Sequence, residues 1–250
     1  MIALKSSWRI SVAIISAYAA LSFCLSFCHQ SATRNSLSAV CFRTAGAAWA
    51  RAVESPLDRF EAEVKRFELS DKDGMPPPGG TLFIGSSTFA HWKTLEAEFK
   101  DCGALNRGFG GSTVPEVNYY AERIAIKYNP ARVVFYAGTN DIAEGHSAQR
   151  VCNDFRAFVE KLHRALPTTQ IYFISMSVPP CRMEFLETYN EGNRLVKEFV
   201  HEQPFLHYID ITPAMHDASG KLRDDYFGPD RLHMNRSGYD AWVPIIRQAL

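Results

Sequence analysis

The stretch Thr81-Leu-Phe-Ile-Gly-Ser-Ser-Thr88 decides the fold of this chain. Four residues that suit a buried strand, 81–84, run directly into a Gly-Ser-Ser turn, and residues 88–100 are expected to form a helix. A strand that ends in such a turn presents a hydroxyl group at the carboxyl edge of a sheet, where open α/β sheets bind ligands. Ser87 is therefore a candidate nucleophile, although the same residues also suit a plain strand-to-helix turn with a serine N-cap.

Short apolar strands alternate with helices along the rest of the chain. The expected strands are 81–84, 104–106, 132–137, 170–175 and 206–209, and the expected helices are 55–69, 88–100, 115–127, 147–166, 182–202 and 237–250. This alternation predicts an α/β protein with a five-stranded parallel sheet that is covered on both faces. Right-handed crossovers then make the fold a three-layer α/β/α sandwich.

Three of the expected strands end in small polar residues, at 85–87, 108–112 and 138–141. Because the carboxyl ends of parallel strands lie at one edge of a sheet, these clusters are expected to meet. Gly111 offers a backbone N–H in a glycine-rich turn, Asn140 offers a side-chain amide, and the backbone N–H of Ser87 is a third candidate oxyanion donor. A phosphate loop is a weak alternative for residues 108–111, which lack the Walker lysine and the full dinucleotide-binding pattern.

A candidate base lies late in the chain, in Pro229-Asp-Arg-Leu-His233. Asp230 precedes His233 by three residues, so one short loop can carry both side chains. The carboxylate then bonds one ring nitrogen while the other nitrogen faces the serine. The alternative for His233 is a loop histidine in front of a helix N-cap. The other histidines have no comparable Asp-x-x-His context.

Composition and charge bound the remaining possibilities. The 250 residues suit one domain with a leader, and the 27 basic and 27 acidic side chains leave no formal net charge. A nucleic-acid partner normally requires a basic surface, so none is expected. The sequence divides into a leader over 1–50, an N-terminal helix and Pro/Gly loop over 51–80, and the main domain over 81–250.

The leader contains an apolar run, 10–28, which follows Lys5 and Arg9. It is about long enough to span a bilayer and somewhat long for the apolar part of a secretory signal. A cleaved signal, an uncleaved N-terminal anchor and a lipoprotein signal ending at Cys28 remain as alternatives. All three most simply predict an exported protein that is periplasmic, extracellular or anchored to a membrane.

Four motifs in order resemble those of the SGNH (GDSL-type) hydrolases, especially the branch similar to platelet-activating-factor acetylhydrolase catalytic subunits and lysophospholipase-like esterases. They are Gly85-Ser-Ser87, Asn106-Arg-Gly-Phe-Gly-Gly111, Gly138-Thr-Asn-Asp141 and Asp230-Arg-Leu-His233. The resemblance covers residues 81–250 and implies a flavodoxin-like fold and ester hydrolysis without a metal or other cofactor.

The same resemblance implies a role for each candidate residue. Ser87 would be the nucleophile, His233 the base, and Asp230 the residue that orients it, with Ser87, Gly111 and Asn140 as oxyanion donors. Ser86 stands where the family usually has an aspartate that is not part of the triad.

The expected function is hydrolysis of small acyl esters by a serine esterase through a covalent acyl-enzyme. An acetylated sugar and a lysophospholipid are both candidate substrates. Two alternatives belong to other classes: an O-acyltransferase that acts on glycans, and a catalytically silent carbohydrate-binding domain on the same fold.

Overall fold

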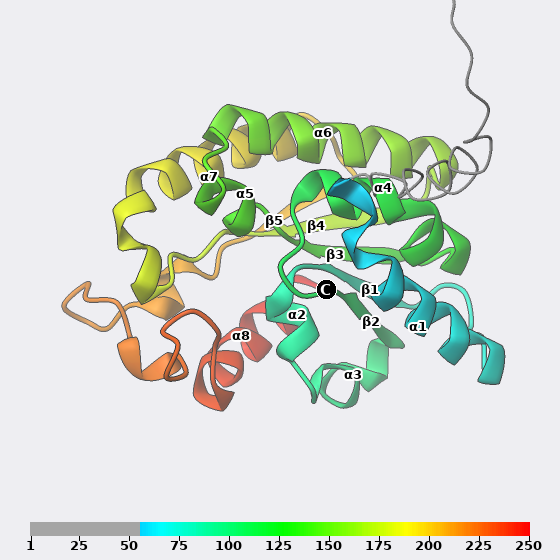
Figure 1. Ribbon diagram of the computed structural model, residues 1–250, viewed down its shortest axis with the longest axis horizontal. Coiled ribbons are helices and arrows are strands. Elements are labelled where there is room, and N and C mark those ends of the chain that lie inside the picture. The colour runs from blue at the N-terminus through cyan, green and yellow to red at the C-terminus, as the bar shows by residue number, and fades with distance from the viewer. Residues whose placement is uncertain (1–55) are drawn as a thin grey trace, which may run out of the picture. The chain divides into compact units, whose positions relative to one another are not determined.

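A five-stranded parallel sheet forms the centre of the molecule (Figure 1). The computed structural model describes residues 56–250, so the leader expected over 1–50 lies outside the described residues. The strands are β1 (Thr81–Gly85), β2 (Ala104–Gly108), β3 (Arg132–Tyr136), β4 (Gln170–Ile174) and β5 (Leu206–Ile209). Their order, β2-β1-β3-β4-β5, is the flavodoxin-like order and reverses direction between β1 and β3. The predicted α/β fold class is confirmed.

Helices cover both faces of the sheet (Figure 1). One face carries α4 (Val114–Ile124), α6 (Ala148–Ala165) and α7 (Leu186–His201), and the other carries α2 (Ser87–His91), α3 (Leu95–Glu98) and α8 (Arg236–Ala249). The other helical segments are η1 (Pro56–Phe60), α1 (Glu61–Asp73), η2 (Lys100–Cys102), η3 (Ile126–Tyr128), α5 (Thr139–Ala143), η4 (Pro180–Phe185), η5 (Thr212–Met215) and η6 (Asp224–Tyr226).

Alternate side chains of each strand enter two separate apolar cores. Phe135 of β3 packs against Phe158 of α6 with ring centroids 4.8 Å apart, whereas its neighbour Tyr136 packs against Trp242 of α8 at 5.1 Å. Strands buried on both faces read as continuous apolar runs, which is why their sequence marks them clearly. This packing on both faces fixes the position of the carboxyl ends of the strands.

The prediction of a single helix over 88–100 was wrong, because the chain turns at Trp92. The Trp92 backbone N–H bonds the Phe89 carbonyl at the end of α2. Its indole ring stacks on Tyr239 of α8 with centroids 4.7 Å apart and donates to Glu98 at 2.7 Å. These tertiary contacts divide the segment into α2, α3 and η2. The helix predicted over 182–202 likewise begins only at Leu186, after η4.

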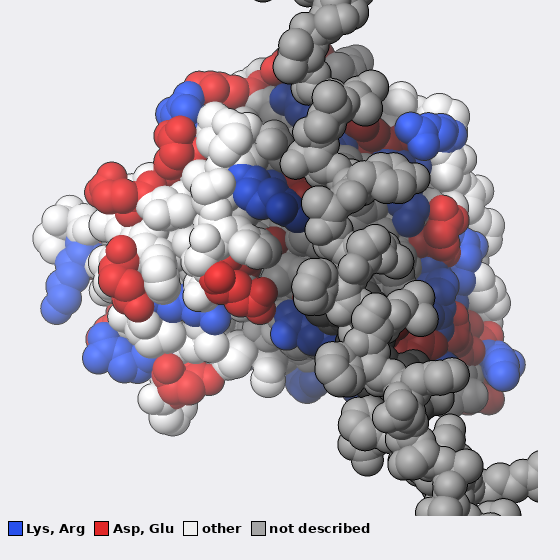
Figure 2. Space-filling view, turned by 45° about the horizontal axis from the view of Figure 1, so that its top comes forward, with Lys and Arg blue, Asp and Glu red and all other residues white. Residues whose placement is uncertain are grey.

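The N-terminal helix α1 is held to the body by ion pairs. Arg123 of α4 contacts Glu61 and Glu68 of α1 at 2.7 Å each, and the buried Asp71 pairs with Arg107 at 2.7 Å. The helix predicted over 55–69 therefore extends to Asp73. Acidic and basic side chains are interspersed on the face shown in Figure 2. Within residues 56–250, no helix is both long and apolar enough to cross a bilayer.

Candidate active site

A small cavity lies beyond the carboxyl ends of β1 and β3, and residues from several separate segments line it. Ser87 and Thr88 follow β1, Thr139 and Asn140 follow β3, Arg182 belongs to η4, and His233 belongs to the loop before α8. The cavity volume is about 30 Å³, which is room for about two water molecules. The structure thus brings together three of the predicted site residues: Ser87, Asn140 and His233.

The turn that carries Ser87 is clamped between the neighbouring strands. Gly85 has φ +142°, and a Cβ atom there would lie 1.9 Å from the Tyr136 carbonyl oxygen, so only glycine fits. The Ser86 N–H donates to the same Tyr136 oxygen at 3.0 Å. Ser86 is 1% exposed and does not line the cavity, whereas Ser87 is half-buried and does. This geometry favours Ser87 over Ser86 as the reactive serine.

Asp230 organises the loop that carries His233. One carboxylate oxygen accepts the backbone N–H groups of Leu232 and His233 at 3.0 Å each, and the other lies 2.6 Å from His233 Nδ1. The hydrogen bond from His233 is the largest cause that lowers the pKa of Asp230, followed by the two backbone bonds. Because an ionised carboxylate only accepts, it favours the tautomer with a proton on Nδ1, which leaves the lone pair of the neutral ring on Nε2.

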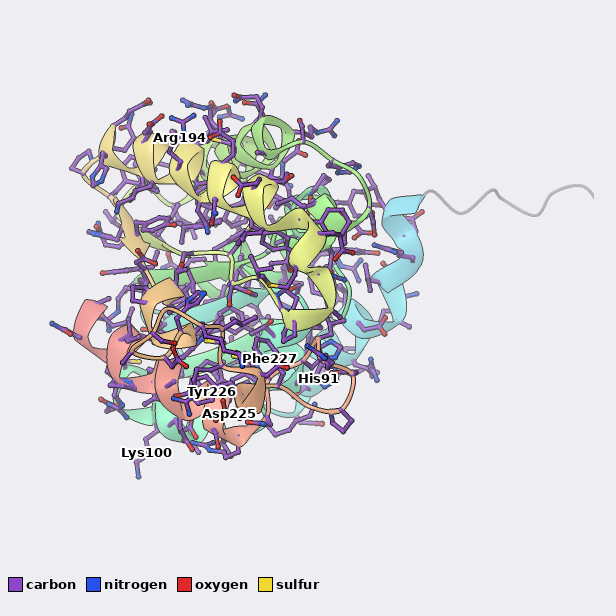
Figure 3. The ribbon with its side chains drawn as sticks, turned by 90° about the vertical axis from the view of Figure 1, so that its left-hand side faces the viewer. His91, Lys100, Arg194, Asp225, Tyr226 and Phe227 are labelled. Carbon is purple, nitrogen blue, oxygen red and sulfur yellow. The ribbon has the colours of Figure 1, made fainter. Side chains whose placement is uncertain are left out.

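A second histidine, His91 at the end of α2, lies against the ring of His233, with ring centroids 4.4 Å apart. Burial is the main cause that lowers the pKa of His91, and the charges of His233 and Lys93 lower it further. His91 therefore packs against the ring of His233 in a partly buried position. Figure 3 shows His91 and the cavity residue Phe227 toward the same edge of the molecule, whereas Arg194 of α7 lies well away from them.

The amide of Asn140 is fixed in one orientation. Its Nδ2 donates to the Ser112 carbonyl at 3.0 Å, and its Oδ1 accepts from Arg182 Nη1 at 3.1 Å. Since Ser112 O can only accept and Arg182 can only donate, these two bonds determine which way the amide points. One N–H of Nδ2 remains available to an oxyanion in the cavity.

Gly111 occupies the exposed loop between β2 and α4 and is not among the residues that line the cavity. Its φ of +80° requires glycine in this conformation. Its carbonyl accepts from Arg59 at 3.2 Å, and the next residue, Ser112, holds Asn140. The loop therefore lies beside Asn140, and oxyanion binding by Asn140 and by the Gly111 N–H stays a prediction.

The role of Asp141 was not identified from the sequence, although the residue forms part of a quoted motif. Its side chain is fully buried, and both carboxylate oxygens accept the Val114 N–H, at 3.0 and 3.2 Å. Burial raises the pKa of Asp141 to about 6, against a smaller opposing effect of the Val114 bond. Asp141 thus joins the segment after β3 to the start of α4, next to the loop that carries Gly111 and Ser112.

A larger cavity of about 150 Å³ lies at the opposite edge of the sheet, near the start of β1 and β2. Apart from Thr81 and Tyr128, apolar, glycine and proline residues line it, so it lacks an acid, a base and a strong nucleophile. Across residues 56–250, no group of three or more His, Cys, Asp or Glu side chains is arranged to hold a metal ion.

Comparison with known proteins identifies the family. Residues 80–241 match the sequence profile of the GDSL-like Lipase/Acylhydrolase family. The chain belongs to this family, and it is a hydrolase of the acyl-ester class. No curated protein sequence matches it.

Solved structures share the fold at low sequence identity. A protein from Streptococcus pneumonia that is described as a platelet activating factor is 20% identical to this chain. Its TM-score is 0.68, and the match covers 77% of this chain and 92% of that protein. A GDSL-like lipase from Bacteroides thetaiotaomicron is 22% identical, with a TM-score of 0.63 over 75% and 97%. A mutant acetyl-xylooligosaccharide esterase from Geobacillus stearmophilus is 18% identical, with a TM-score of 0.56 over 70% and 95%.

Proposed function

We propose that the chain is a serine esterase that hydrolyses small acyl esters through Ser87, His233 and Asp230. One observation carries this proposal: Ser87, Asn140 and His233 line a single cavity, and His233 is bonded to Asp230 at 2.6 Å. Nucleophile, base, orienting acid and oxyanion donor are the parts that acyl transfer requires.

The proposed mechanism gives each of these groups one role. Nε2 of His233 takes the proton of the Ser87 hydroxyl as Oγ attacks the ester carbonyl carbon. The Asn140 amide, together with the backbone N–H groups of Ser87 and Gly111, stabilises the oxyanion. The tetrahedral intermediate collapses, and His233 returns the proton to the leaving alcohol. A water molecule, deprotonated by His233, then attacks the acyl-enzyme, and the acid leaves as His233 returns the proton to Ser87 Oγ.

The lining and the volume of the cavity favour a substrate with a small acyl group. Its apolar lining includes Tyr136, Phe227, Met234 and Trp242, and its volume of about 30 Å³ suits a methyl group better than a long chain. An acetylated sugar and a lysophospholipid remain the two candidate substrate classes. The fold shared with an acetyl-xylooligosaccharide esterase favours the sugar.

Hydrolysis of p-nitrophenyl acetate, butyrate and octanoate by the full chain tests the proposal. We expect acetate to be cleaved fastest, and Ser87→Ala to lose turnover while remaining folded by circular dichroism. Turnover that persists in Ser87→Ala would exclude this nucleophile. The same assay with a glycan acceptor, followed by product analysis, distinguishes hydrolysis from O-acyl transfer. Absence of both reactions in the folded protein would favour a silent binding domain.

We also propose that the protein is exported or tethered to a membrane and needs no nucleic-acid partner. The apolar run 10–28 after two basic residues and the zero net charge support this. Fractionation of cells that express the full chain, with sequencing of its N-terminus, tests export and cleavage together. A soluble cytoplasmic product with an intact N-terminus would contradict export.

A further inference from the structure

Arg182 is a cationic side chain in the cavity to which the sequence assigned no function. It lies in η4, where its backbone (φ −130°, ψ 26°) interrupts the helical geometry. Its side chain lines the same cavity as Ser87 and His233. A backbone hydrogen bond of 3.2 Å from Cys181 N–H to the Arg231 carbonyl connects this segment to the loop that carries Asp230 and His233, called the catalytic loop below.

Within the part of the chain that the structure describes, the protein uses some of the five N–H groups of the Arg182 guanidinium. Nη1 donates to the Thr139 carbonyl and to Asn140 Oδ1, each at 3.1 Å. The Tyr189 hydroxyl, which donates to the same Thr139 oxygen at 3.1 Å, also contacts Arg182. These contacts hold the guanidinium beside Asn140 and leave other guanidinium N–H groups for another acceptor.

Within residues 56–250, no carboxylate lies within ion-pair distance of Arg182. Asp230, the acid beside His233, already bonds His233 and two backbone N–H groups. Arg231 in that loop, by contrast, pairs with Asp224 at 3.0 Å. A half-buried charge without a counter-ion is costly to maintain, and an anionic ligand offsets this cost.

We propose that Arg182 binds an anionic group of the substrate, so that the enzyme prefers esters that carry a carboxylate or phosphate close to the scissile bond. The planar guanidinium suits such oxyanions because it donates two parallel hydrogen bonds. This inference rests on the proposed esterase function and narrows its substrate class.

Matched esters that differ in one charge test the preference. On the alcohol side, 4-acetoxybenzoate is compared with neutral 4-acetoxybenzamide, and 4-acetoxyphenyl phosphate distinguishes phosphate from carboxylate. On the acyl side, p-nitrophenyl hydrogen succinate is compared with p-nitrophenyl butyrate. Each kcat/KM is divided by the rate of spontaneous hydrolysis to remove leaving-group effects.

We expect the wild-type protein to prefer the anionic ester of at least one pair by about 10- to 100-fold, the range of a hydrogen bond to a charged group. Arg182→Met is expected to abolish that ratio, and Arg182→Lys to restore part of it. Because both esters of a pair use Asn140, the ratio cancels any effect of Arg182 on the oxyanion donor. The matched control is Arg194→Met on α7, where Arg194 lies away from the cavity residue Phe227 (Figure 3).

The outcomes separate the two proposals. Ser87-dependent hydrolysis with equal rates for charged and neutral esters overturns only the role of Arg182. Failure to hydrolyse any ester counts against the esterase function itself. Calorimetric titration with 4-hydroxybenzoate and with inorganic phosphate then still tests the anion site. Binding that Arg182→Met loses supports it, and binding that is absent or unchanged in Arg182→Met overturns it.

Discussion

The two halves of the proposed active site are built differently. Ser87 and Asn140 stand at the ends of strands that are buried on both faces, and Asn140 is only 9% exposed. Asp230 and His233 stand on a loop with side chains that are 51% and 28% exposed. The first half owes its geometry to the cores on either side of the sheet. The second half owes it to one carboxylate that bonds its own loop and the catalytic ring.

This difference predicts how far the effect of a substitution extends in each half. At the strand ends, the backbone positions the reacting groups, so removal of one side chain is expected to leave the others in place. In the catalytic loop, Asp230 both orients His233 and holds the loop backbone through Leu232 and His233. A change there disturbs several functions together.

Asp230→Asn is expected to break the loop half and to give the largest effect. The amide can no longer accept from Nδ1 in the same way, so His233 loses its tautomer and orientation, and kcat falls by about 10³- to 10⁴-fold. Hydrogen exchange of residues 228–234 is expected to rise while the melting temperature stays nearly constant. His233→Ala is the control, since it removes the base but keeps the Asp230 bonds to the backbone. Unchanged exchange in Asp230→Asn would refute the organising role.

Asn140→Ala tests the strand-end half. Loss of one oxyanion donor lowers kcat by about 10²- to 10³-fold. KM is expected to change little, because the donor acts on charge that develops in the transition state. Steady-state kinetics with p-nitrophenyl acetate measures both quantities. An effect confined to KM would remove Asn140 from the oxyanion hole.

Asp141→Asn tests the strand-end half through the pH dependence of the free energy of unfolding. The folded state holds the Asp141 proton up to about pH 6, against an ordinary value of 3.8. As the pH rises, the unfolded state therefore loses this proton first, which favours unfolding. The stabilisation that the protonated Asp141 gives the folded state is present below about pH 4 and is lost as the pH rises through 6. At about 1.4 kcal/mol per pKa unit, the loss amounts to about 3 kcal/mol.

Urea unfolding at pH 4 and pH 7 measures this change. Wild-type protein is expected to lose stability relative to Asp141→Asn as the pH rises, and the asparagine variant still offers an acceptor to the Val114 N–H. An equal pH dependence in both proteins would contradict the burial argument.

His91→Ala is expected to have the smallest effect. The ring of His91 packs against the half-buried ring of His233, with ring centroids 4.4 Å apart, and such aromatic contacts are worth about 0.5–1.5 kcal/mol. We expect kcat to fall about two- to tenfold, and His91→Phe to restore most of it. Full activity in His91→Ala would show that Asp230 alone orients the base.

The sequence predicted the parts of the molecule that local patterns determine. The strands were clear because they are apolar on both faces, and the strand-end clusters followed from parallel topology. The divided helix at Trp92 was not predicted, since its cause is a stack on Tyr239 far along the chain. Arg182 was missed for a similar reason: it was placed at the start of a regular helix, and only the folded chain brings it beside Asn140.

The central claim is that His233 activates Ser87 as the nucleophile. Its most direct test is labelling with a fluorophosphonate, in which the serine oxygen displaces fluoride and forms a stable bond to phosphorus, followed by peptide mass mapping. The account predicts one label, on Ser87, which persists in Ser86→Ala and is absent in His233→Ala. A label on Ser86, or labelling that does not require His233, would contradict it.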